Sequence, residues 1–265
     1  MSGNNSLCCR RLNLEDVTSI NDFANDMIAN EPQIDTLVNA AGVTDLPERE
    51  LTKYGVEKQF WVNFLAPYLL TMRLTDKLKE SAKETNDSRV VNIVGSPKNN
   101  WVIDINDLNF DTRKYKTKLA YQQSKMALAY FTILYNRIFY EKGVRSYGVS
   151  PPNMASIAAP LDHQEDTFLN YCRKLLSQWS SIPASSACGT TVLCAIDDKI
   201  IEGDSGGGLY KYLFETWGTR KGWGKLADNE LDAQVLWNLA AKMLLQIPGA
   251  GQTAPSSSAT SNKNK

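Results

Sequence analysis

Short apolar runs recur along the chain and predict the strands of a sheet. Residues 34–40, 89–95 and 144–150 are largely apolar, as is typical of strands buried on both faces of a parallel sheet. Residues 8–14 predict a further strand before these three, and residues 208–214 predict one after them.

Longer stretches between these runs have the character of helices. Residues 15–30 place Val17, Ile20, Phe23 and Met27 on one side, and Leu119 to Tyr140 contains neither Gly nor Pro. The other predicted helical segments are residues 48–85 with a kink at Pro67, residues 162–198 in pieces around Pro183, and residues 228–246. Strands that alternate with helices predict an α/β fold with a parallel, doubly wound sheet.

The domain organisation follows from the same pattern. Residues 1–250 are expected to form one domain, because the length suits a single α/β unit. Residues 251–265 are rich in Ser, Thr, Asn and Lys and predict a disordered tail.

Tyr121 and Lys125 are the candidate chemical pair, in the sequence YQQSK of the long predicted helix. Residues four apart lie on one face of a helix, so the phenol and the ammonium can approach one point. A nearby cation favours the phenolate and lowers its pKa, which would make Tyr121 an acid/base group for a substrate oxygen. Tyr54 and Lys58 share this spacing without a comparable setting, so the spacing alone is not decisive.

Composition and charge exclude several other functions. Lys+Arg and Asp+Glu balance at 29 each, so no basic field for nucleic acid is expected. No apolar run approaches the roughly 20 residues that span a bilayer, and no signal peptide is recognisable. The five cysteines form no C-x-x-C pair and His163 is the single histidine, so we expect reduced thiols, no metal site and a cytoplasmic location.

The order of short motifs resembles that of the short-chain dehydrogenases/reductases. The motifs are NAAG at 39–42, VNFLAPYLLT at 62–71, RVVNIVGS at 89–96, LAYQQSK at 119–125 and GVRSYGVSPP at 143–152. Their wording is most similar to the branch of retinol dehydrogenases and WW-domain oxidoreductases, over roughly residues 10–247. The resemblance implies a three-layer Rossmann-type fold and hydride transfer between NAD or NADP and a lipophilic alcohol or carbonyl compound.

The resemblance also implies catalytic roles. Tyr121 would be the general acid or base, Lys125 would lower its pKa and bind the nicotinamide ribose, and Ser96 would bond the substrate oxygen. Asn63 would support a proton relay through its backbone. Gly95 stands where the family's second serine usually lies, so the register of Ser96 is open by one residue.

Further positions match the family's cofactor-binding residues. Asn39, Ala40 and Gly42 match a turn that supports the central strand and lines the adenosine side, and Asn13 stands where relatives often place an Asp. Pro151 and Ser156 match a segment beside the nicotinamide, although Pro152 replaces its glycine and removes an N–H donor. Apolar residues between Met154 and Trp179 suggest a lipophilic substrate pocket, with core packing as the alternative.

A partner copy is a further expectation from the family. The helix from Leu119 to Tyr140 is apolar on nearly every face over residues 126–135, and family members pair this helix across a dimer axis. Core packing within one chain is the competing explanation.

The glycine-rich turn of dinucleotide-binding folds has no match in the expected place. The family's G-x-x-x-G-x-G would precede the segment at Cys8, so we expect an N-terminally truncated domain with a bare edge at residues 34–40. Three outcomes are open: residues 8–14 fill the gap, a partner covers it, or the chain is a truncated product. The sequence from Gly218 to Gly224 has glycines at the same spacing but no following βα unit. The alternative function is a catalytically silent interaction protein that keeps the fold.

Overall fold

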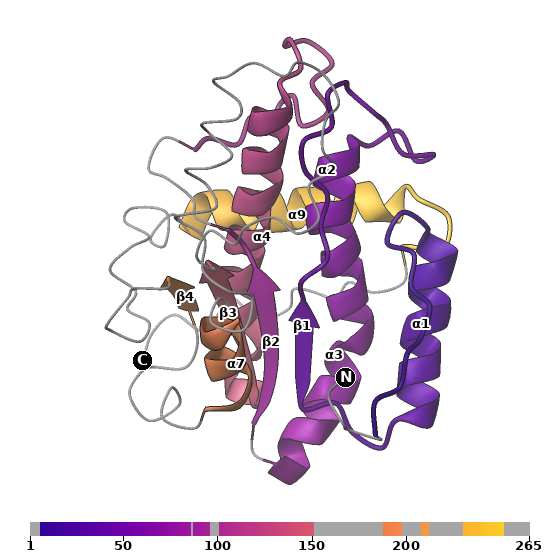
Figure 1. The fold of residues 1–265 in the computed structure, drawn as a ribbon, viewed down its shortest axis with the longest axis vertical. Helices are drawn as coiled ribbons and strands as arrows, with labels where there is room; N and C mark the ends of the chain where they lie inside the picture. The colour runs from indigo at the N-terminus through magenta and orange to yellow at the C-terminus, as the bar shows by residue number, and fades with distance from the viewer. Residues whose placement is uncertain are drawn as a thin grey trace, which may run out of the picture.

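Four parallel strands form the sheet of the computed structural model, which describes residues 6–85, 87–95, 101–150, 188–197, 208–211 (backbone course alone) and 230–251. The strands are β1 (Thr36–Asn39), β2 (Ser88–Ile93), β3 (Val144–Ser150) and β4 (Gly208–Lys211). They pair in the order β1-β2-β3-β4, and each pair is parallel. The predicted parallel α/β sheet is therefore confirmed (Figure 1).

Helices cover both faces of this sheet. Successive residues of a strand face opposite sides, and Val90 packs in the large core with α3 (Ala66–Thr85) and α4 (Thr117–Phe139). Val91 packs instead in a small cluster with Cys194 of α7 (Gly189–Ile196). The result is three layers, with α3 and α4 on one face and α7 on the other.

The described chain ends in a helix that lies over α4. Figure 1 shows α9 (Glu230–Leu245) crossing α4 and α3. The ring of Trp237 stacks on Phe131 at 5.6 Å and 19°, and meets Tyr68 of α3 edge-on at 5.2 Å. Intramolecular packing therefore buries much of the apolar surface of α4 that the family resemblance had assigned to a partner copy.

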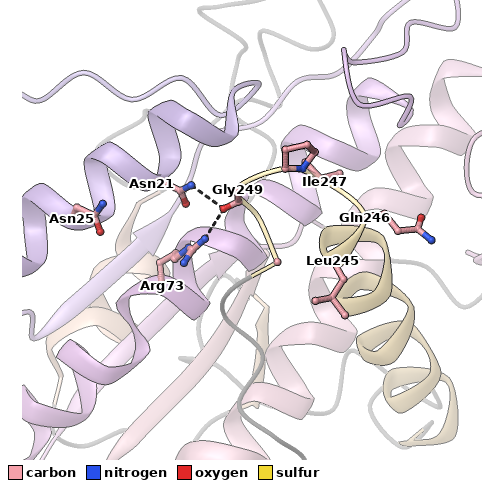
Figure 2. A pocket seen from close by; sticks show the side chains of 9 residues that line it. Asn21, Asn25, Arg73, Leu245, Gln246, Ile247 and Gly249 are labelled. Atoms are coloured by element: carbon pink, nitrogen blue, oxygen red, sulfur yellow. Dashed lines mark hydrogen bonds between the residues drawn. The ribbon is translucent and has the colours of Figure 1, made fainter.

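The turn after α9 is fastened to two other helices. Asn21 of α1 (Val17–Asn30) and Arg73 of α3 donate hydrogen bonds of 2.9 and 2.7 Å to the carbonyl oxygen of Gly249, as Figure 2 shows. Gly249 has a φ of +80°, a left-handed conformation that favours glycine. A cavity of about 650 Å³ lies beside these two hydrogen bonds.

Residues 8–14 do not form the predicted strand. They follow an irregular course beside α1, where Arg10 forms ion pairs with Asp26 at 3.0 Å and Glu31 at 2.6 Å. Strand-like composition needs a neighbouring strand to pair with, and ion pairs to α1 hold this segment instead. Within the described chain, β1 is an edge strand, and Val38 on it is 42% exposed. Of the three open outcomes, the one in which residues 8–14 fill the gap at that edge does not occur.

Residues 48–57 are not helical, contrary to prediction. Gly55 has a φ of +73°, and a bridge joins Leu51 and Glu57. The Glu57 carboxylate then accepts hydrogen bonds from the backbone N–H groups of Gln59 and Phe60 and starts α2 (Lys58–Phe60). Helix formation therefore begins ten residues later than predicted.

The interruption predicted at Pro67 lies just before it. A π-helical turn, η1 (Trp61–Leu65), joins α2 to α3, and the N–H of Ala66 donates to the carbonyl of Trp61. Such turns widen a helix by one residue and are common at functional sites. Asn63 lies in this turn.

The other predicted helices agree with the structure in place and type. α4 begins two residues before the predicted start and ends at Phe139, followed by a short 3-10 turn, η2 (Tyr140–Lys142), and by Gly143 at a φ of +80°. In the part of the chain that the structure describes, no helix has the length and apolarity needed to cross a membrane. The predicted helical pieces over residues 162–187 and the tail beyond Gly251 lie outside the described residues.

Candidate active site

Tyr121 and Lys125 lie at the carboxyl end of the sheet. The Nζ of Lys125 donates a hydrogen bond of 2.8 Å to the carbonyl oxygen of Ile93, the last residue of β2, and lies 5.9 Å from the centre of the Tyr121 ring. Ligands of open α/β sheets bind outside the carboxyl ends of the strands. The predicted pair is therefore in a position suited to chemistry. Tyr54, in the other Tyr-x-x-x-Lys, instead accepts a hydrogen bond from the N–H of Val17 at the start of α1.

Burial controls the protonation of both groups. Lys125 is 5% exposed, and burial lowers its pKa to about 8. Burial also raises the pKa of Tyr121 above its usual value, and the carboxylate of Asp45 adds to this. The lowered phenol pKa expected from Lys125 is not found in this arrangement. The phenol is thus neutral at neutral pH, which suits a proton donor.

Asn63 is held by hydrogen bonds that use its whole amide group. Its Oδ1 accepts from the N–H of Val43 at 2.7 Å, and its Nδ2 donates to the Val43 carbonyl at 2.9 Å and to Ser124 Oγ at 3.0 Å. The side chain is fully buried. The amide therefore holds the backbone of the turn at Val43, and the expected part of Asn63 in a proton relay stays a prediction.

Gly42 lies beside Asn63 and Lys125, and its expected place on the adenosine side of a cofactor stays a prediction. A Cβ on Gly42 would lie 2.9 Å from Asn63 Oδ1 and 3.5 Å from Lys125 Nζ. The absence of a side chain is therefore required where the turn after β1 approaches α4 and η1.

Asn39 supports the sheet from within the core. Its Nδ2 donates to Thr71 Oγ1 at 3.1 Å and to Asn92 Oδ1 at 2.8 Å, and Asn92 Nδ2 donates to Thr132 Oγ1 at 2.9 Å. This buried chain links α3, β1, β2 and α4. Ala40, one residue on, is exposed.

Asn13 caps a turn in front of α1. Its Oδ1 accepts from the N–H of Glu15 at 3.0 Å, and its own N–H donates to Ser19 Oγ at 2.9 Å. Asn13 is exposed. These contacts make it a helix-start residue, and its expected adenine contact stays a prediction.

Comparisons with known proteins decide the family. A model of the short chain dehydrogenase family matches residues 2–101. Human retinol dehydrogenase 11 is 30% identical over 245 residues, which is 92% of this chain and 71% of that protein. The chain belongs to the short-chain dehydrogenase family. Human retinol dehydrogenase 13 is 41% identical over 148 residues, 56% of this chain but only 43% of the relative, so the match spans less than half of that protein.

Solved structures agree with this short-chain dehydrogenase fold. An uncharacterised protein from Mycobacterium paratuberculosis superposes with a TM-score of 0.59 at 25% identity, over 88% of this chain and 74% of that one. Carbonyl reductase from chicken fatty liver, solved with NADPH bound, has a TM-score of 0.50 at 21% identity, over 76% of this chain and 72% of that one. The second likeness concerns the fold alone.

Gly95 faces the phenol in this short-chain dehydrogenase. A Cβ built on Gly95 would lie 3.5 Å from the Tyr121 hydroxyl, and its φ of +74° is left-handed. Gly95 thus presents no side chain to Tyr121. Ser96, Pro151 and Ser156 lie outside the described residues, as do the apolar segment from Met154 to Trp179 and the glycines at 218–224.

The loop at residues 101–116, just before α4, lies beside the candidate site. Gln123 Oε1 accepts from the N–H of Asp104 at 3.2 Å and from Arg113 at 3.0 Å, and Gln123 Nε2 donates to the Leu108 carbonyl at 3.0 Å. The loop is therefore tied to α4 two residues from Tyr121.

Asp107 holds this loop together. Its carboxylate accepts from the N–H groups of Asp111 at 2.6 Å and Arg113 at 3.0 Å, and from Thr112 Oγ1 at 2.9 Å. Burial disfavours the ionised carboxylate, but these hydrogen bonds outweigh it and lower the pKa to about 2.

Proposed function

We propose that this chain transfers hydride between NAD or NADP and a lipophilic alcohol or carbonyl compound, with Tyr121 as the acid/base group. The observation that carries the proposal is the convergence of Tyr121, Lys125 and the Asn63 turn at the carboxyl end of β2. The names of the retinol dehydrogenase relatives support a lipophilic substrate.

The nicotinamide end of a cofactor suits the residues present. Lys125 has three N–H donors, and the described residues take one of them, through the Ile93 carbonyl. A buried ammonium with donors to spare suits ribose hydroxyls. Pro151 and Ser156 are proposed to flank the nicotinamide. The described ranges contain no glycine-rich turn for a pyrophosphate, so the fit concerns the nicotinamide end only.

The chain's own groups would manage the proton. Bound nicotinamide supplies or accepts the hydride. Tyr121 would give its proton to the substrate oxygen in reduction and take it back in oxidation. Lys125 would hold the ribose. Pro67 has no N–H, so the carbonyl of Asn63 four residues earlier lacks the donor that an α-helix would supply, and it suits a relay water.

Substrate-oxygen binding is proposed for Ser96, which follows Gly95 directly. If Ser96 fills this role, Ser96→Ala lowers kcat for carbonyl reduction by about 100-fold, the size seen when an oxyanion donor is removed. An unchanged kcat would leave Tyr121 as the sole donor at that oxygen.

Cofactor titration and a phenol deletion test the proposal. We expect micromolar binding of NADH or NADPH by fluorescence, and loss of carbonyl reduction in Tyr121→Phe. Tyr140→Phe is the matched control, because it removes a phenol hydroxyl just beyond the other end of α4. Equal activity in wild type and Tyr121→Phe would end the proposal.

A silent interaction protein is the second candidate. It is favoured by Gly95, which leaves the position facing Tyr121 without a hydroxyl. Absence of NADH and NADPH binding even at millimolar concentration would support this candidate over the enzyme.

A homodimer through the helix from Leu119 to Tyr140 remains part of the family-based proposal. Such a dimer would have to form on surface of α4 that α9 leaves free, because Trp237 already stacks on Phe131.

A further inference from the structure

A continuous chain of hydrogen bonds leads from the turn after β1 to the backbone of Tyr121. Asn63 Nδ2 donates to Ser124 Oγ at 3.0 Å, and Ser124 Oγ donates to the carbonyl oxygen of Tyr121 at 2.8 Å. At its other end, the Asn63 amide holds both backbone groups of Val43. Asn63 and Ser124 are each 0% exposed.

Ser124 is the junction of this chain. Both hydrogens of the Asn63 amide are used, one on Val43 and one on Ser124. The single hydroxyl proton of Ser124 is directed to Tyr121. Among the side-chain hydrogen bonds of the described residues, this hydroxyl is the one link between Asn63 and α4.

We propose that Ser124 is a positioning residue, which fixes the turn of α4 carrying Tyr121 and Lys125 relative to the Asn63 turn. This rests on the proposed function. Ser124 touches neither substrate nor cofactor in this assignment. Its hydroxyl acts through the Tyr121 backbone, so its loss lets the phenol and the ammonium shift away from the carboxyl end of β2.

The same helix offers a matched control. Thr132 is also 0% exposed, accepts a hydrogen bond from an Asn amide, Asn92 Nδ2, at 2.9 Å, and donates to the carbonyl of Leu128 at 2.8 Å. It thus makes the same two kinds of bond two turns further along α4. The two hydroxyls differ in the residue whose carbonyl accepts their proton: for Ser124 it is Tyr121, which bears the phenol, and for Thr132 it is Leu128.

The experiment compares Ser124→Ala with Thr132→Val. Each leaves one buried Asn amide hydrogen without a partner, so both lower the melting temperature. We expect kcat of carbonyl reduction to fall by about 10- to 100-fold in Ser124→Ala with KM changed by less than about twofold, because small misplacements of reacting groups are that costly. The pH at half-maximal kcat also shifts in Ser124→Ala. Thr132→Val keeps both kcat and the pH profile, and Ser124→Thr, which retains the hydroxyl, restores most of the activity.

A second readout does not depend on activity. Hydrogen exchange followed by mass spectrometry should show faster exchange over residues 118–126 in Ser124→Ala, and unchanged exchange there in Thr132→Val. Equal effects of the two variants on kcat and on exchange would overturn the proposal. If Ser124→Ala does not fold, Ser124→Cys, with a weaker donor of similar size, is read by the same criteria. If wild type lacks activity, the proposed function fails, and the exchange pattern alone decides the role of Ser124.

Discussion

The ammonium of Lys125 is fastened to the carbonyl of Ile93, at the point where β2 ends. This hydrogen bond is 2.8 Å long and holds a nearly buried cation at the carboxyl end of β2. Among the ion pairs of the described residues, none joins Lys125 to a carboxylate. A buried charge without a counter-charge lowers the stability of the folded chain.

Lys125→Met should stabilise the chain while abolishing activity. The pKa of Lys125 falls from 10.5 to about 8 on burial, so the unfolded chain binds this proton more strongly than the folded chain. Stability therefore rises as pH increases from about 8 to 10.5, and below pH 8 the penalty is constant. We expect a gain of up to about 3 kcal/mol at pH 7 from removing the charge, less about 1 kcal/mol for the lost hydrogen bond. Urea unfolding at pH 7 and pH 10 measures this, and the gain should shrink at pH 10.

Gly42→Ala should disturb the site through Asn63. The added Cβ would lie 2.9 Å from Asn63 Oδ1, so one of the two must move. We expect about 1–3 kcal/mol of destabilisation, as for other overpacked sites, and at least about a tenfold loss of kcat. Gly189→Ala is the control, because a Cβ there meets nothing within 4 Å and the residue lies in the first turn of α7. Equal effects of both substitutions on kcat would contradict the geometry.

Asp107→Asn should loosen the loop in front of α4. A group whose folded pKa is lowered, here to about 2, contributes stability above its unfolded pKa of 3.8, and that contribution is lost as pH falls through 2. The variant should melt at a lower temperature at pH 7 and lose less stability than wild type between pH 4 and 2. Limited proteolysis within residues 101–116 should also be faster. Asp76→Asn, whose side chain is 88% exposed, should change neither measurement.

Trp237→Ala should uncover α4. The ring stacks on Phe131 and meets Tyr68, and we expect its loss to cost about 2 kcal/mol because the side chain is only partly buried. Light scattering after size-exclusion chromatography then shows whether the exposed face associates. Gln234→Ala, an exposed residue of the same helix, is the control. A dimeric wild type that becomes monomeric in Trp237→Ala would instead place α9 in the dimer interface.

Local pattern was sufficient for much of the fold. Residues 144–150 form β3 with the predicted bounds, and the Gly- and Pro-free stretch around Tyr121 is one helix, because burial on all sides and lack of breakers are properties of the segment itself. The strand predicted at residues 8–14 does not form, since a strand needs a neighbour and the ion pairs of Arg10 are tertiary contacts that the segment itself does not encode.

In the candidate site, too, features set by one segment could be predicted and features set by tertiary contacts could not. Spacing brought Tyr121 and Lys125 together, but the direction of the Tyr121 pKa depends on burial and on Asp45, which is 76 residues away in sequence. The approach of Gly42 to Asn63 and the junction at Ser124 likewise depend on how separate segments pack. No pattern of residue types within one segment contains that information.

The hydrogen bonds to the Gly249 carbonyl join segments that lie far apart in the described chain. Asn21 and Gly249 are separated by 228 positions, so this bond closes only after nearly all of the described chain has been synthesised. Until then the rings of Phe131 and Tyr68 lack their cover, Trp237. A nascent chain stalled before α9 would present an aromatic surface to its neighbours, and in such chains aggregation competes with folding.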